Sequence, residues 1–133
     1  MTEVYVGGRE YQDIDGSVTF VDHRPTRKDA AKIRRLRKYV ARKFEAAGVQ
    51  PPPVFRALID DGDLVPLAVD IHKPLAALVG MKKSRQILKA VCRSAPYHKA
   101  LIMANFRLGL DLEITEPLTN ANVAHARGNL GRG

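Results

Sequence analysis

The chain has 133 residues, one cysteine, and 22 Lys and Arg against 14 Asp and Glu, which gives a formal net charge of +8. This length predicts a single domain, the lone Cys92 excludes an intramolecular disulfide, and no apolar run reaches the ~18 residues of a membrane-spanning helix. The amino terminus lacks the basic and apolar segments of a secretory signal, so we expect a cytoplasmic protein with no membrane partner.

The charges are segregated along the chain. Residues 1–22 contain five acids and one base, residues 24–43 contain ten bases and only Asp29 as an acid, and residues 71–110 contain eight bases and no acid. A charge that served solubility alone would mix both signs. Two basic blocks depleted of acids therefore indicate a surface that binds a polyanion, with nucleic acid as the leading class.

Residues 1–22 are an acidic segment that has two interpretations. Val18–Val21 favours a strand, and Asp15-Gly16 is a turn pair, which together indicate a short β-hairpin. The alternative is an acidic amino-terminal tail. We expect the main domain to occupy residues 23–133 and to begin with a basic helix.

Residues 26–47 have the pattern of an amphipathic helix. Thr26 is the expected N-cap, Leu36, Val40 and Phe44 recur at helical spacing, and Gly48 ends the helix. Bases flank one side of the apolar stripe and lie opposite it, which gives the helix a broad basic face. They form an accessory basic helix: Lys28, Lys32, Arg34, Arg35, Lys38 and Arg42.

The next segment contains few functional signals. Pro51–Pro53 predicts an extended spacer, Val54–Leu58 a short helix or turn, and Lys73–Val79 a helix. The run 60–63 predicts an acidic turn whose spacing does not match a calcium loop, so we expect no metal and no cofactor. Leu64–Ile71 is apolar and expected to be buried.

Lys82–Arg93 has the clearest helical pattern in the chain. Ile87, Leu88 and Val91 form its expected buried side. The opposite face has bases at positions i, i+3, i+7 and i+11, which is typical of a surface that follows phosphates: Lys82, Arg85, Lys89 and Arg93.

Ser94 is predicted to cap another helix, with Pro96 in its first turn. A helix start offers free N–H groups and a positive dipole end, which bind phosphate, and Tyr97 in the first turn could stack on a base or a ribose. The alternative for Tyr97 is a half-buried aromatic with a hydrated hydroxyl. Short strand segments then follow around a turn in 106–114, and Thr119–Leu130 is the last expected helix. The predicted fold class is mainly α with a small β element.

Four segments resemble the ProQ/FinO family of RNA chaperones, in the order and approximate spacing of that family. They are Pro66-Leu67-Ala68-Val69-Asp70-Ile71, the Tyr-containing helix start Ser94–Leu101, Arg107-Leu108-Gly109-Leu110-Asp111, and Val123-Ala124-His125-Ala126-Arg127-Gly128-Asn129-Leu130. The resemblance covers about residues 66–130. It implies an elongated FinO-like RNA-binding domain and a protein that is not an enzyme.

The resemblance also implies a partner and a site. The partner is structured RNA, a stem-loop with a single-stranded 3′ tail, and the function is to stabilise small or antisense RNAs and help them pair with target mRNA. A monomer is expected. The RNA 3′-end pocket would comprise Ser94, Tyr97 and Arg107, and stem contacts would come from the following bases: Lys82, Arg85, Lys89, Arg93 and Lys99.

The chain departs from the family pattern at four positions. Asp70 stands where the family has Gly, and Ala68 stands where some members have Lys. Gly109 replaces the Asp after Arg-x, and Leu112 replaces the Gly of the turn. The last two departures fall in the predicted β turn and beside Arg107.

Two other classes of function fit parts of the sequence. The helices 82–93 and 96–103, separated by a tight turn, also suit a helix-turn-helix regulator that binds DNA. However, the bases lie along the first helix rather than at the start of the second. A metal-dependent nuclease would need an Asp-x-Lys spacing, which Asp70 and Lys73 do not provide.

Overall fold

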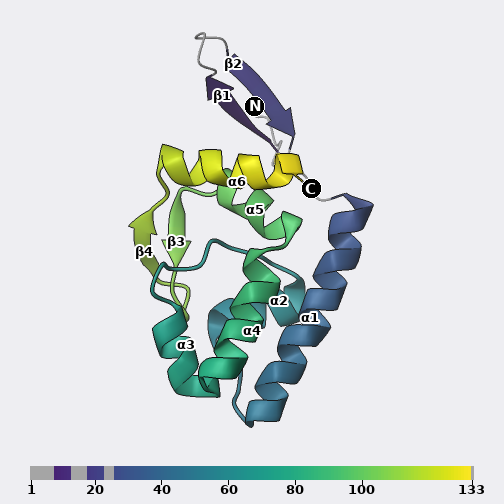
Figure 1. The fold of residues 1–133 in the computed structure, drawn as a ribbon, viewed down its shortest axis with the longest axis vertical. Helices are drawn as coiled ribbons and strands as arrows, with labels where there is room; N and C mark the ends of the chain where they lie inside the picture. Colours follow the sequence, from purple (N-terminus) through teal and green to yellow (C-terminus); the bar gives the residue numbers. More distant parts are fainter. Residues whose placement is uncertain (1–7, 13–17, 23–25, 133) are drawn as a thin grey trace.

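The computed structural model describes residues 8–12, 18–22 and 26–132, and helices dominate this part of the chain (Figure 1). The helices are α1 (Arg27–Ala47), α2 (Pro53–Asp61), α3 (His72–Val79), α4 (Met81–Cys92), α5 (Ala95–Met103) and α6 (Asn120–Arg132). The strands are β1 (Gly8–Gln12), β2 (Val18–Asp22), β3 (Phe106–Leu108) and β4 (Ile114–Pro117), and they form two separate antiparallel pairs, β1–β2 and β3–β4. The predicted fold class, mainly α with a small β element, is confirmed.

The long helix α1 begins and ends where the sequence predicts. Thr26 is its N-cap and forms a reciprocal capping box with Asp29, while Gly48 ends it with a left-handed φ of 69°. One side of α1 buries Leu36, Val40 and Phe44. In Figure 1 the helix runs along one flank of the molecule beside α4.

The segment after α1 differs from the expectation. Pro53 does not belong to an extended spacer: it occupies the first turn of α2, where its missing N–H would have no helical partner. Asp60 and Asp61 lie in the last turn of this helix rather than in a separate acidic turn. The helix ends at Gly62, whose φ of 74° favours glycine.

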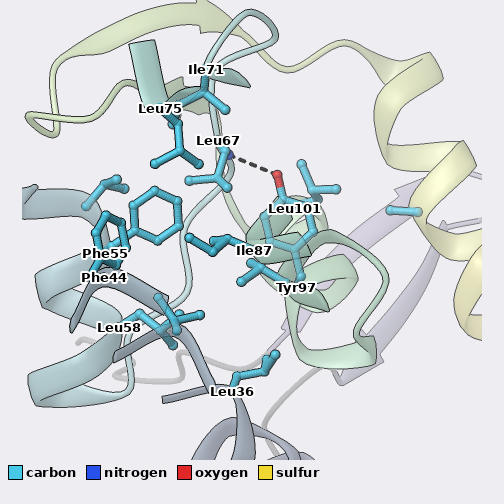
Figure 2. Close-up of a cluster of buried hydrophobic side chains, with 14 of the residues drawn as sticks. Leu36, Phe44, Phe55, Leu58, Leu67, Ile71, Leu75, Ile87, Tyr97 and Leu101 are labelled. Atoms are coloured by element: carbon cyan, nitrogen blue, oxygen red, sulfur yellow. Dashed lines mark hydrogen bonds between the residues drawn. The ribbon is translucent and has the colours of Figure 1, made fainter. Parts of the chain in front are cut away.

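The core lies between α1, α2 and the helices α3 to α5 (Figure 2). The Phe44 and Phe55 rings are 5.5 Å apart, and Leu58, Leu75 and Ile87 are fully buried beside them. The prediction that Leu64–Ile71 is buried is only partly right. Leu67 and Ile71 enter the core, but Val69 lies in a turn and is 64% exposed.

The turn between β3 and β4 forms although Gly109 and Leu112 depart from the family pattern. Leu112 occupies the turn with a φ of 66°, a conformation that costs free energy for any residue except glycine. Its N–H donates to the carbonyl oxygen of Gly109 at 3.0 Å. The Glu113 carboxylate fills the space that a Cβ at Gly109 would need, so a larger residue at this position would displace the carboxylate.

Of the two interpretations for the amino-terminal segment, the structure shows strands. β1 and β2 pair in register from Gly8 opposite Asp22 to Gln12 opposite Val18. The connecting residues 13–17 and the first seven residues lie outside the described part of the chain.

Candidate nucleic-acid interface

The predicted basic row on α4 is exposed to solvent along the whole helix. Lys82, Arg85, Lys89 and Arg93 all lie on the surface, while Ile87 and Val91 on the other side are fully buried. The helix is held against α3 by Ser84, whose buried hydroxyl donates to the carbonyl oxygen of His72 at 3.4 Å. This bond and the buried side chains fix the orientation of α4, so the four bases of the row point to solvent.

The structure brings together bases of α1 and α4 that lie more than 50 residues apart in the sequence. A surface groove of about 590 Å³ separates α1 from α4, and we call it the α1–α4 groove. Its lining residues are Lys32, Arg35, Leu36, Tyr39, Gln86, Lys89, Ala90 and Arg93. None of these lining residues is acidic, so the described lining of the groove carries four cations and no carboxylate.

The α1–α4 groove also contains an aromatic residue that the sequence analysis missed. Tyr39 is 37% exposed, and Lys43 lies over its ring, with Nζ 5.2 Å from the centroid. The same Nζ donates to the Oε1 of Gln86 at 2.7 Å and so connects α1 to α4. The sequence contains the pattern that could have identified Tyr39: it lies one helical turn after Arg35 and one turn before Lys43, so an aromatic ring is placed between two bases on one face of the helix.

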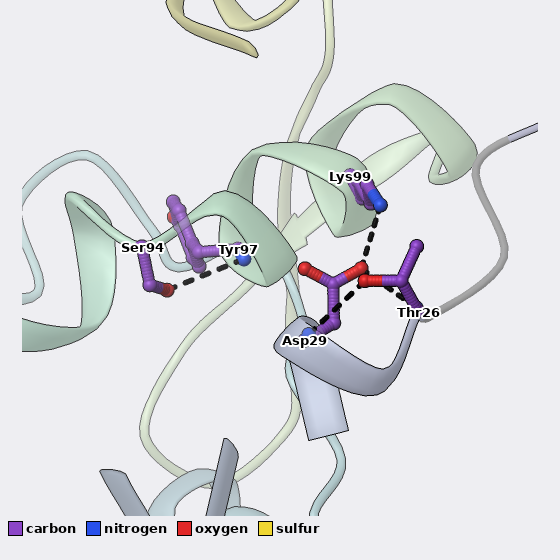
Figure 3. A network of polar contacts seen from close by, with 5 residues as sticks. All are labelled: Thr26, Asp29, Ser94, Tyr97 and Lys99. Atoms are coloured by element: carbon purple, nitrogen blue, oxygen red, sulfur yellow. Dashed lines mark hydrogen bonds and ion pairs between the residues drawn. The ribbon is translucent and has the colours of Figure 1, made fainter. Parts of the chain in front are cut away.

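The acid within the first basic block does not neutralise the groove. The Asp29 carboxylate accepts from the Thr26 backbone N–H at 2.9 Å and from Lys99 Nζ at 2.6 Å (Figure 3). Burial alone would raise the pKa of Asp29, but the bonds from Lys99 and Thr26 outweigh it and hold the pKa below its ordinary value. Asp29 therefore connects α1 to α5.

This ion pair changes the interpretation of Lys99, which we had placed among the RNA stem contacts. Its side chain is only 20% exposed and its ammonium group lies against the Asp29 carboxylate, whose side chain is 5% exposed. A cation that is already paired and half-buried has a structural role between two helices. We therefore remove Lys99 from the set of predicted stem contacts.

The helix start predicted at Ser94 is present in the structure. Ser94 caps α5: its hydroxyl donates to the carbonyl oxygen of Val91 at 2.7 Å and accepts from the Tyr97 N–H at 3.4 Å (Figure 3). Pro96 lies in the first turn, as expected. Ser94 is itself buried, so its role in the structure is to position the start of α5.

Tyr97 and Arg107 both bond to the backbone of Leu67, but not as the sequence analysis expected. The Tyr97 hydroxyl accepts from the Leu67 N–H at 2.9 Å (Figure 2), and the Arg107 guanidinium donates to the Leu67 carbonyl oxygen at 2.9 Å. Tyr97 is 4% exposed, so its ring offers no face for a base, and the alternative of a half-buried, hydrated tyrosine is also wrong. Arg107 is half-buried.

The surroundings of Tyr97 have a low polarity. Burial raises the pKa of the Tyr97 hydroxyl, which therefore stays protonated and able to donate as well as accept. Burial also raises the pKa of the nearby Cys92 thiol, against the opposing effects of Tyr97 and Arg107. The thiol is thus kept in its unreactive, protonated form.

A second hollow lies at the start of α5, where α4, α5 and α6 meet. It is lined by Cys92, Arg93, Ala95, His98, His125, Asn129 and Leu130. Burial and then the neighbouring His125 lower the pKa of His98, so His98 is neutral at pH 7. This hollow adjoins the end of the α4 row through Arg93.

The accessory basic helix divides into two groups in the structure. Lys32 and Arg35 line the α1–α4 groove, whereas Arg34 and Lys38 are exposed on α1 and do not line it. Lys28 and Arg42 are also exposed. A further base from the same helix, Arg37, donates from Nε and Nη2 to the carbonyl oxygens at 59 and 60 and so holds the end of α2.

The structure argues against α5 as the recognition helix of a helix-turn-helix protein. Pro96, Tyr97, Leu101 and Ile102 of this helix are buried, and its base Lys99 is paired with Asp29. A recognition helix must expose polar side chains along its length to enter a DNA groove. Among the residues of α5, only Ala95 is exposed.

The described residues offer neither a metal site nor a membrane-spanning helix. No group of three or more His, Cys, Asp or Glu in this part of the chain is arranged to hold a metal ion. Among the described helices, none has the length and apolar character needed to cross a membrane.

A solved structure has a fold similar to that of this chain. The crystal structure of NMB1681 from Neisseria meningitidis MC58, a FinO-like RNA chaperone, matches with a TM-score of 0.52 and 21% sequence identity, over 71% of this chain and 92% of that chain. No family model and no curated protein sequence matches the chain. The structural match confirms the ProQ/FinO-like fold that the four sequence segments indicated.

Proposed function

We propose that the protein is an RNA-binding chaperone that recognises a structured RNA with a stem-loop and a single-stranded 3′ tail. By binding such RNAs it would stabilise small or antisense RNAs and promote their pairing with target mRNA. The observation that carries the proposal is the acid-free basic surface formed by α4 and the facing side of α1, on a fold shared with a FinO-like RNA chaperone.

The chemistry of the basic surface suits an RNA stem. A-form helices hide base edges in a deep groove, so a protein that binds the stem contacts phosphates and 2′-hydroxyls rather than sequence. Lys82, Arg85, Lys89 and Arg93 follow one another at about one-turn intervals along α4 and all are exposed. A row of this kind lies along a phosphate backbone without selecting bases.

The 3′ tail would bind where α5 begins. We propose Arg107 as the contact with the RNA 3′ end, because this residue is only half-buried. Ser94 and Tyr97 act indirectly: Ser94 positions the helix start, and Tyr97 holds the N–H of Leu67, the residue whose carbonyl oxygen accepts from Arg107. These three residues remain the proposed pocket, with Tyr97 as a positioning residue rather than a stacking platform.

A competition titration tests the proposal. The labelled ligand is a stem-loop with a short 3′ uridine tail, and the competitors are the same RNA with a blocked 3′-hydroxyl, a blunt stem-loop, and duplex DNA of equal length. We expect the free-ended, tailed RNA to compete best, since only it fills both the basic row and the 3′-end pocket.

Variants separate the two parts of the proposed site. Arg107→Ala is expected to weaken tailed RNA far more than blunt RNA, whereas Arg85→Ala weakens both alike. Equal losses on both RNAs for Arg107→Ala would remove the pocket assignment. Equal competition by duplex DNA would show that the basic surface is not selective for RNA.

A further inference from the structure

The α1–α4 groove contains more than phosphate binding requires. A surface that only follows phosphates needs cations, whereas this groove combines four cations with an exposed tyrosine ring. Its size, about 590 Å³, lies within the range of small-molecule sites, roughly 300–1,000 Å³. The groove is thus large enough for a single nucleotide. Its tyrosine ring suits the base, and its cations suit the phosphate.

The geometry of Tyr39 favours a stacking role. Its neighbour in the chain, Val40, is fully buried and fixes this turn of α1, so the ring stands on a rigid element. Lys43 lies over the ring at 5.2 Å and is itself held by Gln86. One face of the ring is therefore occupied by a cation, and a planar ligand would stack on the other face.

The cations lie on both sides of the groove. Lys32 and Arg35 come from α1, about two turns and one turn before Tyr39 respectively, and Lys89 and Arg93 line the groove from the α4 side. Backbone phosphates on either side of a stacked base would meet these charges. An acidic peptide would satisfy the cations but would leave the aromatic ring unused.

We propose that the α1–α4 groove binds an unpaired nucleotide of RNA, with its base stacked on Tyr39 and its flanking phosphates on the facing cations of α1 and α4. The ligand must be unpaired because the base faces of a duplex are already stacked on one another. The inference rests on the proposed RNA-binding function and deepens it. The groove would hold a single-stranded segment beside the stem, apart from the 3′-end pocket at α5.

The test uses an RNA hairpin whose 3′ end is blocked and whose 5′ side carries a six-nucleotide single strand containing 2-aminopurine. The reference ligand is the same hairpin without the single strand. Dissociation constants and 2-aminopurine fluorescence are measured for the wild-type protein and for Tyr39→Ala, Tyr39→Phe and Phe106→Ala. Phe106 is the matched control, because it is an exposed aromatic on β3, away from the groove.

We expect Tyr39→Ala to weaken the single-stranded RNA at least about 5-fold and to abolish the fluorescence quenching, because stacking on one aromatic is worth that much or more. Tyr39→Phe keeps the ring and is expected to stay within about 2-fold of wild type, as is Phe106→Ala. Binding of the blunt hairpin is expected to change less than about 2-fold in all variants. Since Tyr39 is exposed, circular dichroism should show an unchanged fold.

Three results would overturn the inference. Tyr39→Ala could leave the single-stranded RNA unaffected, it could weaken both hairpins equally, or polyglutamate could displace the single strand as well as oligouridine does. In each case a wild-type protein that still binds tailed RNA leaves the proposed function standing. If the wild-type protein does not bind the tailed RNA with a free 3′ end either, the proposed function itself fails.

Discussion

Asp29 shows how one residue can determine the charge of a whole surface. It is the only acid among the ten bases of residues 24–43, and on α1 it could have neutralised part of the basic face. Instead it is buried, closes the capping box with Thr26 and binds Lys99 of α5. The result is that one carboxylate and one ammonium group are used for stability, and the exposed bases of α1 remain unopposed by this carboxylate.

The first prediction concerns this ion pair. Asp29→Asn is expected to lower the free energy of unfolding by about 2 kcal/mol at pH 7, because it weakens charge-assisted hydrogen bonds at a buried position. The pKa of Asp29 is lowered in the folded state, so its contribution is complete above the ordinary value of 3.8 and is lost as the pH falls through the lower folded pKa. Urea denaturation of the wild-type and Asp29→Asn proteins at pH 7 and pH 2.5 measures the loss of stability and its dependence on pH.

The control for this prediction is Asp63→Asn, because Asp63 is exposed. It is expected to change the free energy of unfolding by less than about 0.5 kcal/mol at either pH. A wild-type advantage over Asp29→Asn that is as large at pH 2.5 as at pH 7 would contradict the pKa argument.

Tyr97 is a residue whose position in the helix was predicted correctly but whose role was not. The sequence places it in the first turn of α5, which is correct, but its side chain points inward and satisfies the Leu67 N–H. Because a buried N–H without an acceptor costs about 1–3 kcal/mol, truncation of Tyr97 would alter folding as well as binding. Arg107 is therefore the better residue for testing the 3′-end pocket.

At the scale of elements, the backbone conformation of the β3–β4 turn costs conformational free energy at one residue. Leu112 adopts a left-handed φ of 66°, where an L-residue loses about 1–2 kcal/mol relative to glycine. The turn is nevertheless held by the bond from the Leu112 N–H to Gly109 and by the Glu113 carboxylate, which accepts from the Asp111 N–H at 3.0 Å. Surrounding contacts thus maintain a turn that its central residue disfavours.

The second prediction follows from this turn. Leu112→Gly is expected to raise the free energy of unfolding by about 0.5–1 kcal/mol, since relief of the strained φ exceeds the greater entropy of glycine in the unfolded chain. Thermal or urea unfolding measures the difference. Leu112→Ala is the control: it keeps the Cβ and hence the strain, and is not expected to stabilise. A Leu112→Gly protein less stable than wild type would contradict the argument.

At the scale of the molecule, the basic surface is assembled from two segments. Six cations face the proposed RNA: Lys32, Arg35, Lys82, Arg85, Lys89 and Arg93. Neither α1 nor α4 alone provides more than four of these charges. The packing of α1 against α4 therefore creates a field that neither segment has by itself.

The third prediction is the salt dependence of this surface. Neutralising about six phosphates should make log K fall against log salt with a slope near −4 to −5. Each charge removed, as in Arg85→Ala, is expected to reduce the slope by about 1. Arg56→Ala is the matched control, because this exposed arginine belongs to α2 and bonds to Gln50. A flat salt response in the wild-type protein would contradict a phosphate-binding role for the surface.

The sequence by itself determined the local structure. Helical spacing and capping residues such as Thr26, Gly48 and Ser94 predicted the helices, because caps and periodicity act within a few residues of the chain. The row on α4 was predictable for the same reason. The tertiary structure alone decided which charges are free and which rings are exposed: it paired Lys99 with Asp29, buried Tyr97, and placed Tyr39 in a groove between α1 and α4. Those outcomes depend on contacts between residues some 30 to 70 positions apart, and no local pattern encodes them.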